Sequence, residues 1–348
     1  MRRTLLFLAL AACTAKGDRP EIGATREAIQ GGTTDTTDTF AVSVLDDVGG
    51  LCSGTLIAPN LVLTARHCVA DGGSDPIDCA TDRFDAPRAA SSFRVTLDTN
   101  ADFDTAEYAA AKVIVPKDTL FCGNDLALII LTKTVAGSPT FAAPSLDVPN
   151  ITKVTAIGYG TTAPGLMDDG KRRRLDDVKV ECVPGIPALD CDLSTYDMTK
   201  AELAAGNGLC EGDSGSGAYD LTAPSSPVVV GLLSRAGDDA GKCIDAIYTR
   251  TDAFGPLLID TAKSAAQSGG YALPSWANPS PTDPDAGPIA DEDAATDPQS
   301  DPAPSAAPQE TPTVTTTKDG CSAAPGRANA WWLLVLAWAV ARPRRRRA

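Results

Sequence analysis

Histidine is almost absent from this chain: His67 is the only one among 348 residues. The ten cysteines include no Cys-x-x-Cys pair, and only one imidazole is available as a ligand, which argues against a zinc or iron–sulfur site. We therefore expect no metal and no cofactor. A reaction that needs an imidazole base near neutral pH has a single candidate for it, His67.

Basic residues are in the minority, with 30 Lys and Arg against 45 Asp and Glu and a formal net charge of −15. A chain of this sign repels phosphate backbones and anionic lipid headgroups. We expect no nucleic-acid partner and no passive binding to an anionic membrane surface. Part of the acidity lies near the C-terminus, so it carries little information about an active site.

Long apolar runs are also lacking. A transmembrane helix needs about 20 consecutive apolar residues, and no run in this chain is that long. Residues 5–12 form a short apolar run behind Arg2 and Arg3, which is typical of a signal peptide. Its end, Leu10-Ala11-Ala12-Cys13, resembles a bacterial lipobox. We expect residues 1–13 to be a lipoprotein-type signal peptide with Cys13 lipidated, and residues 14–28 to be a propeptide. Ordinary cleavage nearby, with Cys13 left as a plain thiol, is the alternative.

The C-terminal part changes composition from about Pro274 to Asp319, where Pro, Asp, Ala, Ser and Thr dominate. Such a segment buries too little apolar surface to fold, so residues 271–319 are predicted to be a disordered stalk. Residues 320–348 contain Cys321, an apolar run at 330–341 and an arginine cluster. This order resembles the C-terminal sorting tails of the MYXO-CTERM type, which implies a Gram-negative protein attached to the outer membrane at the cell surface. A transmembrane anchor with a positive-inside stop is the alternative.

The middle of the chain holds an even set of spaced cysteines behind the export signal. This pattern predicts four disulfides in an oxidising compartment. The cysteines are Cys52, Cys68, Cys79, Cys122, Cys182, Cys191, Cys210 and Cys243.

Short segments rich in β-branched residues and bounded by Gly, Pro, Asn and Asp predict a mostly β domain. The predicted strands are residues 40–45, 52–57, 61–64, 93–97, 112–115, 126–131, 153–157, 178–182, 217–219, 228–233 and 247–249. One amphipathic segment, residues 255–267, predicts a helix. Strand spacing alone does not choose between a barrel and a sandwich.

Four motifs in chain order carry the functional signal. They are Cys52-Ser53-Gly54-Thr55-Leu56-Ile57 with Leu63-Thr64-Ala65-Arg66-His67-Cys68, then Asn124-Asp125-Leu126-Ala127-Leu128-Ile129, Gly158-Tyr159-Gly160, and Cys210-Glu211-Gly212-Asp213-Ser214-Gly215. Together they resemble the motifs of chymotrypsin-like serine proteases over about residues 29–269. The resemblance implies two six-stranded antiparallel β-barrels with a short C-terminal helix at residues 29–270. It also implies a monomeric serine endopeptidase acting on proteins or peptides.

The resemblance assigns roles residue by residue. Ser214 attacks the scissile carbonyl, His67 moves the proton, and Asp125 orients and stabilises the imidazole. The backbone amides of Gly212 and Ser214 form the oxyanion hole, and glycine at 212 permits the backbone angles that aim its amide inward.

Activation is also implied by the resemblance. The family's zymogens are cut before a β-branched residue, and Ile29-Gln30-Gly31-Gly32 resembles that new N-terminus. The ammonium of Ile29 then pairs with Asp213. Because Ala28 precedes the cut, no activator specific for Lys or Arg is implied. The same cut separates the catalytic domain from Cys13, so the C-terminal tail alone retains it at the surface.

Family positions imply the disulfides Cys52–Cys68 and Cys210–Cys243, and elimination leaves Cys79–Cys122 and Cys182–Cys191. The sequence departs from the family at Arg66, where a small residue is usual, and at Ser216-Gly217, where glycine-proline is usual.

The specificity pocket is assigned to Gly208, Ser234, Ala236, Ala246 and Asp245. Ser234-Arg235-Ala236 stands where the family usually carries Ser-Trp-Gly. Ala236 and Ala246 favour a small or medium apolar residue before the scissile bond. An inward-pointing Asp245 favours Lys or Arg instead, and the unusual spacing around Cys243 leaves that aspartate unplaced.

Two other functions compete with the protease. A catalytically inactive homologue acting as a surface binding module has the same fold, but the complete set of catalytic residues argues against it. An α/β-fold hydrolase runs in the order Ser, Asp or Glu, His, whereas this chain has His, Asp, Ser.

Overall fold

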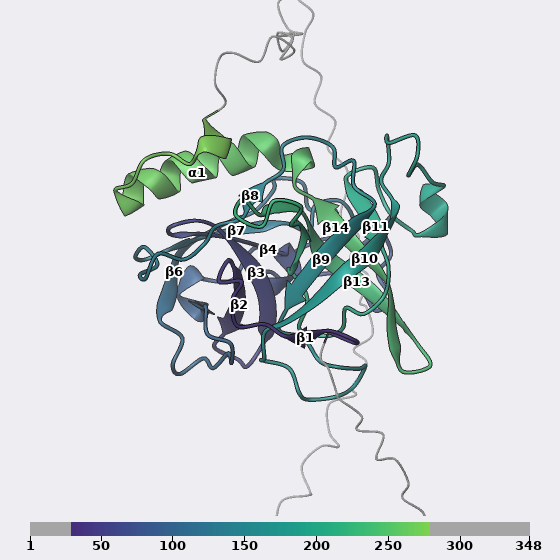
Figure 1. Cartoon of the computed structure of the whole chain (residues 1–348), viewed down its shortest axis with the longest axis horizontal. Helices are drawn as coiled ribbons and strands as arrows, with labels where there is room; N and C mark the ends of the chain where they lie inside the picture. The colour runs from purple at the N-terminus through teal and green to yellow at the C-terminus, as the bar shows by residue number, and fades with distance from the viewer. Residues whose placement is uncertain (1–28, 279–348) are drawn as a thin grey trace, which may run out of the picture. The chain divides into compact units, whose positions relative to one another are not determined.

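The computed structural model describes residues 29–278, and the structural statements below refer to that range. Strands dominate it, and one α-helix follows the last strand (Figure 1). The expected signal peptide, propeptide and sorting tail, with Cys13 and Cys321, lie outside the described residues, as does most of the expected stalk. Within residues 29–278, no helix has the length and apolarity needed to cross a bilayer.

The first half of the domain is a closed barrel with the strand order β2-β3-β4-β7-β6-β5. Successive side chains of a strand point to opposite faces, and in the central strands of this barrel both faces are buried. In β7, Ala127, Ile129 and Leu131 pack in one core cluster, whereas Leu128 and Ile130 pack in another with the helix. This explains the continuous apolar run there. The strands are β2 (Ala41–Asp46), β3 (Leu51–Ala58), β4 (Leu61–Thr64), β5 (Phe93–Thr96), β6 (Tyr108–Ile114) and β7 (Ala127–Leu131).

The second half closes in the same way, because β9 pairs with both β12 and β10 at the ends of the order β10-β11-β14-β13-β12. Its strands are β9 (Lys153–Gly158), β10 (Arg173–Cys182), β11 (Glu202–Ala205), β12 (Gly217–Asp220), β13 (Val228–Asp239) and β14 (Lys242–Arg250). Two short strands, β1 (Thr33–Thr34) and β8 (Ala143–Pro144), add to β10 and β13. The predicted pair of six-stranded antiparallel barrels is confirmed, and an α/β fold is excluded.

One barrel strand was missing from the sequence prediction. β11 has the sequence Glu-Leu-Ala-Ala, which lacks β-branched residues, yet it pairs with β14 along its whole length and with β10. The polar hairpin end of β13 and β14 was also missed, since both strands continue beyond their predicted bounds. Tertiary pairing decides these segments, and local sequence does not.

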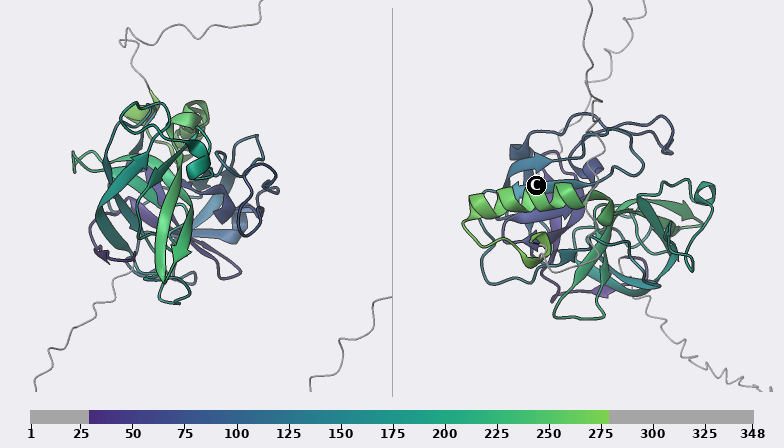
Figure 2. Two further views of the ribbon diagram at one scale, coloured as in Figure 1. Left: turned by 90° about the vertical axis from the view of Figure 1, so that its right-hand side faces the viewer. Right: turned by 90° about the horizontal axis from the view of Figure 1, so that it is seen from above.

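The helix α1 (Gly255–Gly269) agrees with the predicted 255–267 and packs against β3 and β7 of the first barrel (Figure 2). Beyond it, the Tyr271 hydroxyl and the Asn60 amide oxygen are 2.7 Å apart, and the Trp276 ring donates to the Ile57 carbonyl at 3.2 Å. The packed segment therefore continues to residue 278, past the boundary expected at residue 270.

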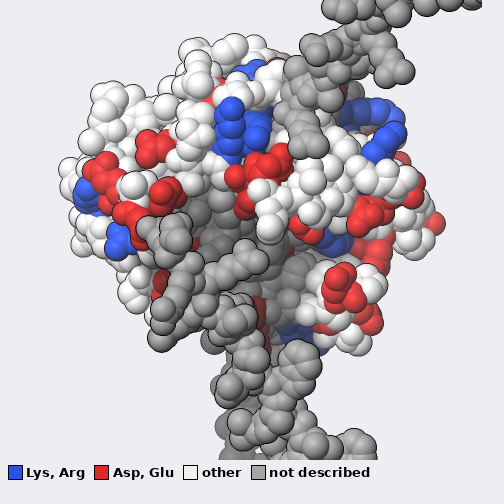
Figure 3. Space-filling view, turned by 90° about the horizontal axis from the view of Figure 1, so that it is seen from below, with Lys and Arg blue, Asp and Glu red and all other residues white. Residues whose placement is uncertain are grey.

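Charges of both signs are mixed over the surface. On the face in Figure 3, Lys and Arg are interspersed with Asp and Glu. Some charged residues of the described range form ion pairs, such as Lys133 with Glu107 at 2.6 Å and Lys153 with Asp177 at 2.9 Å. Because these pairs are exposed, each contributes at most about 1 kcal/mol to the free energy of unfolding.

Candidate active site

His67 and Asp125 are brought together by the pairing of two neighbouring strands. Thr64, the last residue of β4, pairs with Ala127 at the start of β7. His67 lies in the short 3₁₀ turn after β4, and Asp125 lies just before β7. The His67 Nδ1 is 2.7 Å from the Asp125 Oδ2, and the His67 backbone N–H donates to Oδ1 at 2.9 Å. Asp125 is fully buried, while the His67 side chain is 23% exposed to the cleft side.

A third residue completes this hydrogen-bond set. The buried Ser234 hydroxyl donates to the Asp125 Oδ2 at 2.7 Å. Sequence reasoning assigned Ser234 to the specificity pocket and did not find this contact. A serine near the start of a family motif carries no local signal that its hydroxyl points toward an aspartate 109 residues away.

The pKa values of the pair are set by opposing effects. Burial disfavours the charged imidazole, but the Asp125 carboxylate outweighs it, so the pKa of His67 is raised above its usual value. Burial also disfavours the Asp125 carboxylate, but His67 and the hydrogen bonds from Ser234 and the His67 amide hold the pKa of Asp125 below its usual value. Asp125 therefore stays ionised beside an imidazole that can accept a proton.

Ser214 lies on the turn between Cys210 and β12. The Ser53 N–H of β3 donates to the Ser214 carbonyl at 2.8 Å, which fastens this turn to the first barrel. Ser214 and His67 line the same cleft, whose volume is about 890 Å³. The cleft is therefore lined by both the predicted base and the predicted nucleophile.

The backbone around Ser214 leaves two amides available. Gly212 has φ of 88°, a left-handed conformation that favours glycine, and an added Cβ would lie 2.9 Å from the Gly160 Cα. Among the described residues, neither the Gly212 nor the Ser214 N–H has a hydrogen-bond acceptor. Two such donors beside a nucleophile can stabilise a developing oxyanion.

Asp213 is fully buried next to this turn. It accepts hydrogen bonds from the Gly160 N–H at 2.8 Å and the Cys210 N–H at 2.9 Å. Gly160 must lack a side chain, since a Cβ there would lie 2.6 Å from the carboxylate. Burial raises the pKa of Asp213 to about 7, against the effect of both hydrogen bonds. No cation of the described range forms an ion pair with it.

The predicted N-terminal residue Ile29 is also fully buried. Its neighbour Gln30 donates its backbone N–H to the Gly208 carbonyl at 2.8 Å. The segment after the expected cut therefore lies against the loop that leads to Ser214.

The expected pocket residues separate into two groups. Ala236, Ser234 and Asp245 line the cleft, whereas Gly208 and Ala246 are buried behind its surface. The Asp245 side chain is on the exposed rim, and its N–H donates to the Asn207 side chain at 3.2 Å.

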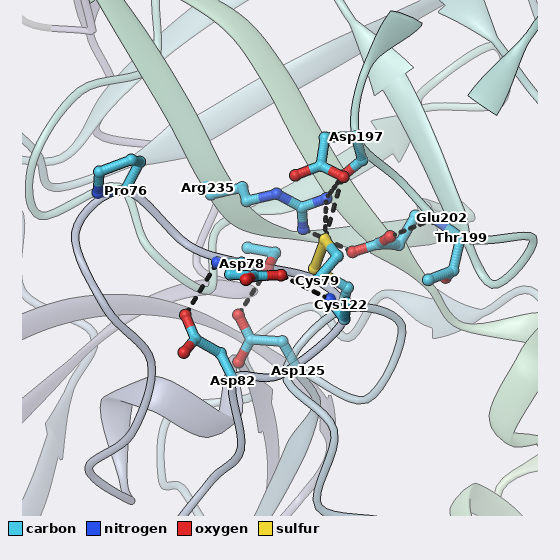
Figure 4. Close-up of a disulfide and its surroundings, with 12 residues drawn as sticks. Pro76, Asp78, Cys79, Asp82, Cys122, Asp125, Asp197, Thr199, Glu202 and Arg235 are labelled. Carbon is cyan, nitrogen blue, oxygen red and sulfur yellow. Dashed lines mark hydrogen bonds and ion pairs between the residues drawn. A yellow bond between two sulfur atoms is a disulfide. The ribbon is translucent and has the colours of Figure 1, made fainter. Parts of the chain in front are cut away.

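Arg235 gives one wall of the cleft a charged character. It donates to Glu202 at 2.6 Å and to the Asp197 carbonyl at 2.6 Å, beside the Cys79–Cys122 disulfide (Figure 4). Glu202 is fully buried, and its second oxygen accepts the Thr199 N–H at 2.7 Å. The sequence indicated the substitution of an aromatic residue but not this buried counter-charge.

Arg66, the other departure from the family, lies away from the cleft. Its guanidinium donates to the carbonyls of Pro116 and Asp118 at 3.2 and 2.6 Å and covers the Phe84 ring at 4.7 Å. The large residue beside His67 is therefore accommodated within the first barrel.

Residues 29–278 contain four disulfides, and they are the pairs expected from the sequence: Cys52–Cys68, Cys79–Cys122, Cys182–Cys191 and Cys210–Cys243. Cys52, Cys68 and His67 lie close enough together to suggest metal ligands. Their two sulfur atoms are bonded to each other, so they offer no thiolate to an ion.

The pH dependence of the site follows from the raised pKa of His67. We expect kcat/KM for a peptide substrate to rise with pH along a limb centred above 6.5, because only the neutral imidazole can accept the serine proton. In Asp125→Asn the limb moves to lower pH, and the rate falls about 10⁴-fold. Rates measured from pH 5 to 9 test this, and a flat profile would contradict His67 as the base.

Comparisons with known proteins agree with this geometry. The sequence profile of the trypsin family matches residues 29–258. The chain is 30% identical over 182 residues to brachyurin of Leptuca pugilator, which covers 50% of this chain and 73% of that protein. It is 27% identical over 209 residues to scolexin B of Heliothis virescens, covering 57% and 69%. It is 22% identical over 228 residues to the venom peptide isomerase heavy chain of Agelenopsis aperta, covering 59% and 84%.

Proposed function

Because the chain belongs to the trypsin family of serine proteases, we propose that it is an endopeptidase that hydrolyses protein or peptide substrates. The observation that carries this proposal is the hydrogen-bonded His67–Asp125 pair, with His67 on the same cleft as Ser214. The relatives include a protein named as an isomerase, so the reaction rests on the site as well as on the family.

The reaction follows from which imidazole nitrogen is free. Nδ1 is held by Asp125, so Nε2 faces the substrate and takes the proton of the Ser214 hydroxyl as its oxygen attacks the carbonyl carbon. His67 then gives that proton to the leaving amine, and the carbonyl carbon remains bonded to the Ser214 oxygen. Water repeats the two steps on this acyl-enzyme and releases the acid.

The Gly212 and Ser214 amides would bind the oxygen that gains negative charge. Each such donor lowers the barrier by about 2.7–4 kcal/mol. Their position depends on the turn that Asp213 holds from behind through its contacts with Gly160 and Cys210.

Cleavage before Ile29 would stabilise the turn that carries the Gly212 and Ser214 amides. It creates an ammonium group that can neutralise the buried Asp213 carboxylate. In the uncleaved chain, Ile29 has φ of 43°, a left-handed conformation that costs a β-branched residue about 1–2 kcal/mol. Because φ is defined by the preceding carbonyl carbon, cleavage removes the backbone strain at Ile29. Loss of this strain and neutralisation of Asp213 both favour the docked N-terminal segment.

Export and surface attachment are parts of the same proposal. Four disulfides suit an oxidising compartment. We expect a monomer that is released from Cys13 by the activating cut and retained at the outer membrane by the tail that contains Cys321.

The activating cut can be located directly. We expect the surface-retained active form to begin Ile29-Gln30-Gly31-Gly32 on N-terminal sequencing. Finding residues upstream of Ile29 still attached to the active form would refute both the cut and the release from Cys13.

Active-site labelling tests the reaction itself. A fluorophosphonate probe should label the cleaved protein at Ser214, because the probe reacts with a serine activated by a base. The uncleaved chain should label much more slowly, and Ser214→Ala should not label. Absence of serine-dependent labelling after a verified cut would favour the inactive binding module.

A further inference from the structure

Gln30, the second residue after the proposed cut, holds two segments of the cleft region at once. Its side-chain Nε2 donates to the Gly241 carbonyl at 2.9 Å, and its Oε1 accepts the Cys243 N–H at 3.2 Å. Its backbone N–H donates to the Gly208 carbonyl at 2.8 Å. Both ends of the amide are therefore used, each with main-chain partners.

The bonded segments adjoin residues that line the cleft. Gly241 lies at the turn of the β13–β14 hairpin, and Cys243 is joined by its disulfide to Cys210 on the loop before Ser214. Both cysteines line the cleft. The Gly208 N–H donates to the Cys243 carbonyl at 2.9 Å, which closes a ring of hydrogen bonds through Gln30.

Beyond its own strand pairing and the Cys210–Cys243 disulfide, this part of the hairpin has little other support. Residues 236–242 are exposed, and the β13–β14 register shifts twice, between Leu233 and Arg235 and between Arg235 and Gly237. Segments with few buried contacts and exposed hydrogen bonds open locally at low free-energy cost. The hairpin nevertheless supplies Ala236, Gly237 and Asp238 to the cleft.

We infer that Gln30 is a positioning residue that couples docking of the N-terminal segment to the pocket wall. The inference rests on the proposed protease function. Asp213 supports the turn that carries the Gly212 and Ser214 amides. Gln30 supports the β13–β14 hairpin, the wall that binds the substrate residue before the scissile bond. When the segment leaves, the wall loses its anchor, so substrate binding responds to docking separately from the chemical step.

Gln30→Met tests this in the full chain cut before Ile29, because methionine keeps the length of the side chain but not its amide. We expect KM to rise about tenfold, as for the loss of two hydrogen bonds, with kcat within about twofold. Preference among peptides that differ only before the scissile bond should shrink. Gln30→Glu keeps the acceptor for Cys243 and loses the donor to Gly241, so its KM should be intermediate.

A second measurement does not depend on activity. Hydrogen exchange of residues 236–243 should be faster in Gln30→Met than in the parent chain. Thr33→Val, in exposed β1, is the matched control and should change neither KM nor exchange. Unchanged KM, preference and exchange in Gln30→Met would overturn the inference, as would a loss confined to kcat. If the parent fails to label with fluorophosphonate, the proposed function fails, while the exchange rates still decide the role of Gln30.

Discussion

Replacing His67 with alanine will abolish turnover, lowering kcat by about a millionfold, as expected when the base of such a triad is lost. The chain contains no other histidine that could substitute for it. Asp125 and Ser234 remain, but both are buried and hydrogen-bonded to each other, so we expect neither to replace His67 as the base for Ser214.

The measurement is kcat for a peptide substrate after cleavage before Ile29, with Ser214→Ala as the comparison. The two variants should be equally inactive, and the double variant should lose no more, because the two residues act as one unit. The melting temperature should fall only modestly, since Asp125 keeps its hydrogen bonds from the Ser234 hydroxyl and from the backbone N–H of residue 67. Residual activity above about one hundredth of the parent's would contradict His67 as the base.

The sequence located His67 and Asp125 because both stand in motifs with a fixed relation to strands. His67 lies three residues after the end of β4 and Asp125 two residues before the start of β7, so antiparallel pairing of these strands places them together. The apolar runs that predicted both strands therefore also determine the distance between the two side chains. Sequence reasoning succeeds here because fold and site depend on the same pairing.

The sequence failed where a contact joins distant segments through polar groups. Ser234 reaches Asp125, and Arg235 reaches Glu202, with no pattern in either neighbourhood that requires the contact. Gln30 reaches Gly241 across 211 residues in the same way. A side-chain hydrogen bond constrains only two atoms and leaves the hydrophobic periodicity of the sequence unchanged. Such a contact is therefore seen only in the folded chain.

Replacing Asp213 with asparagine will lower kcat/KM of the cleaved protein at least about a thousandfold. Asparagine keeps the shape of the side chain but cannot neutralise an ammonium group, so the turn that carries Gly212 and Ser214 loses its support. Loss of a single oxyanion donor costs about 10²–10³ in rate, and this substitution affects both. Asp177→Asn, at an exposed aspartate paired with Lys153, is the matched control and should retain full activity. Activity near that of the control would exclude the activation ion pair.

The same substitution should change the stability of the uncleaved chain in the opposite direction at neutral pH. Burial raises the pKa of Asp213 to about 7 from its ordinary 3.8, so the folded state binds more protons than the unfolded state between these values. The stability that the protonated group contributes is complete below about pH 3.8 and is lost as the pH rises through 7, a difference on the order of 4 kcal/mol.

Denaturant unfolding of the uncleaved chain at pH 5 and pH 8, with disulfides intact, measures the part of this decline that falls above pH 5, about 3 kcal/mol. Asp213→Asn should remove most of the decline and be more stable than the parent at pH 8. Cleavage before Ile29 should remove it as well, because an ammonium beside the carboxylate lowers the pKa of Asp213. Equal pH dependence in the parent and the variant would mean that Asp213 is not a buried, unpaired carboxyl group before cleavage. If the decline is found and cleavage abolishes it, the buried charge that destabilises the uncleaved chain is the same charge that holds the new N-terminus.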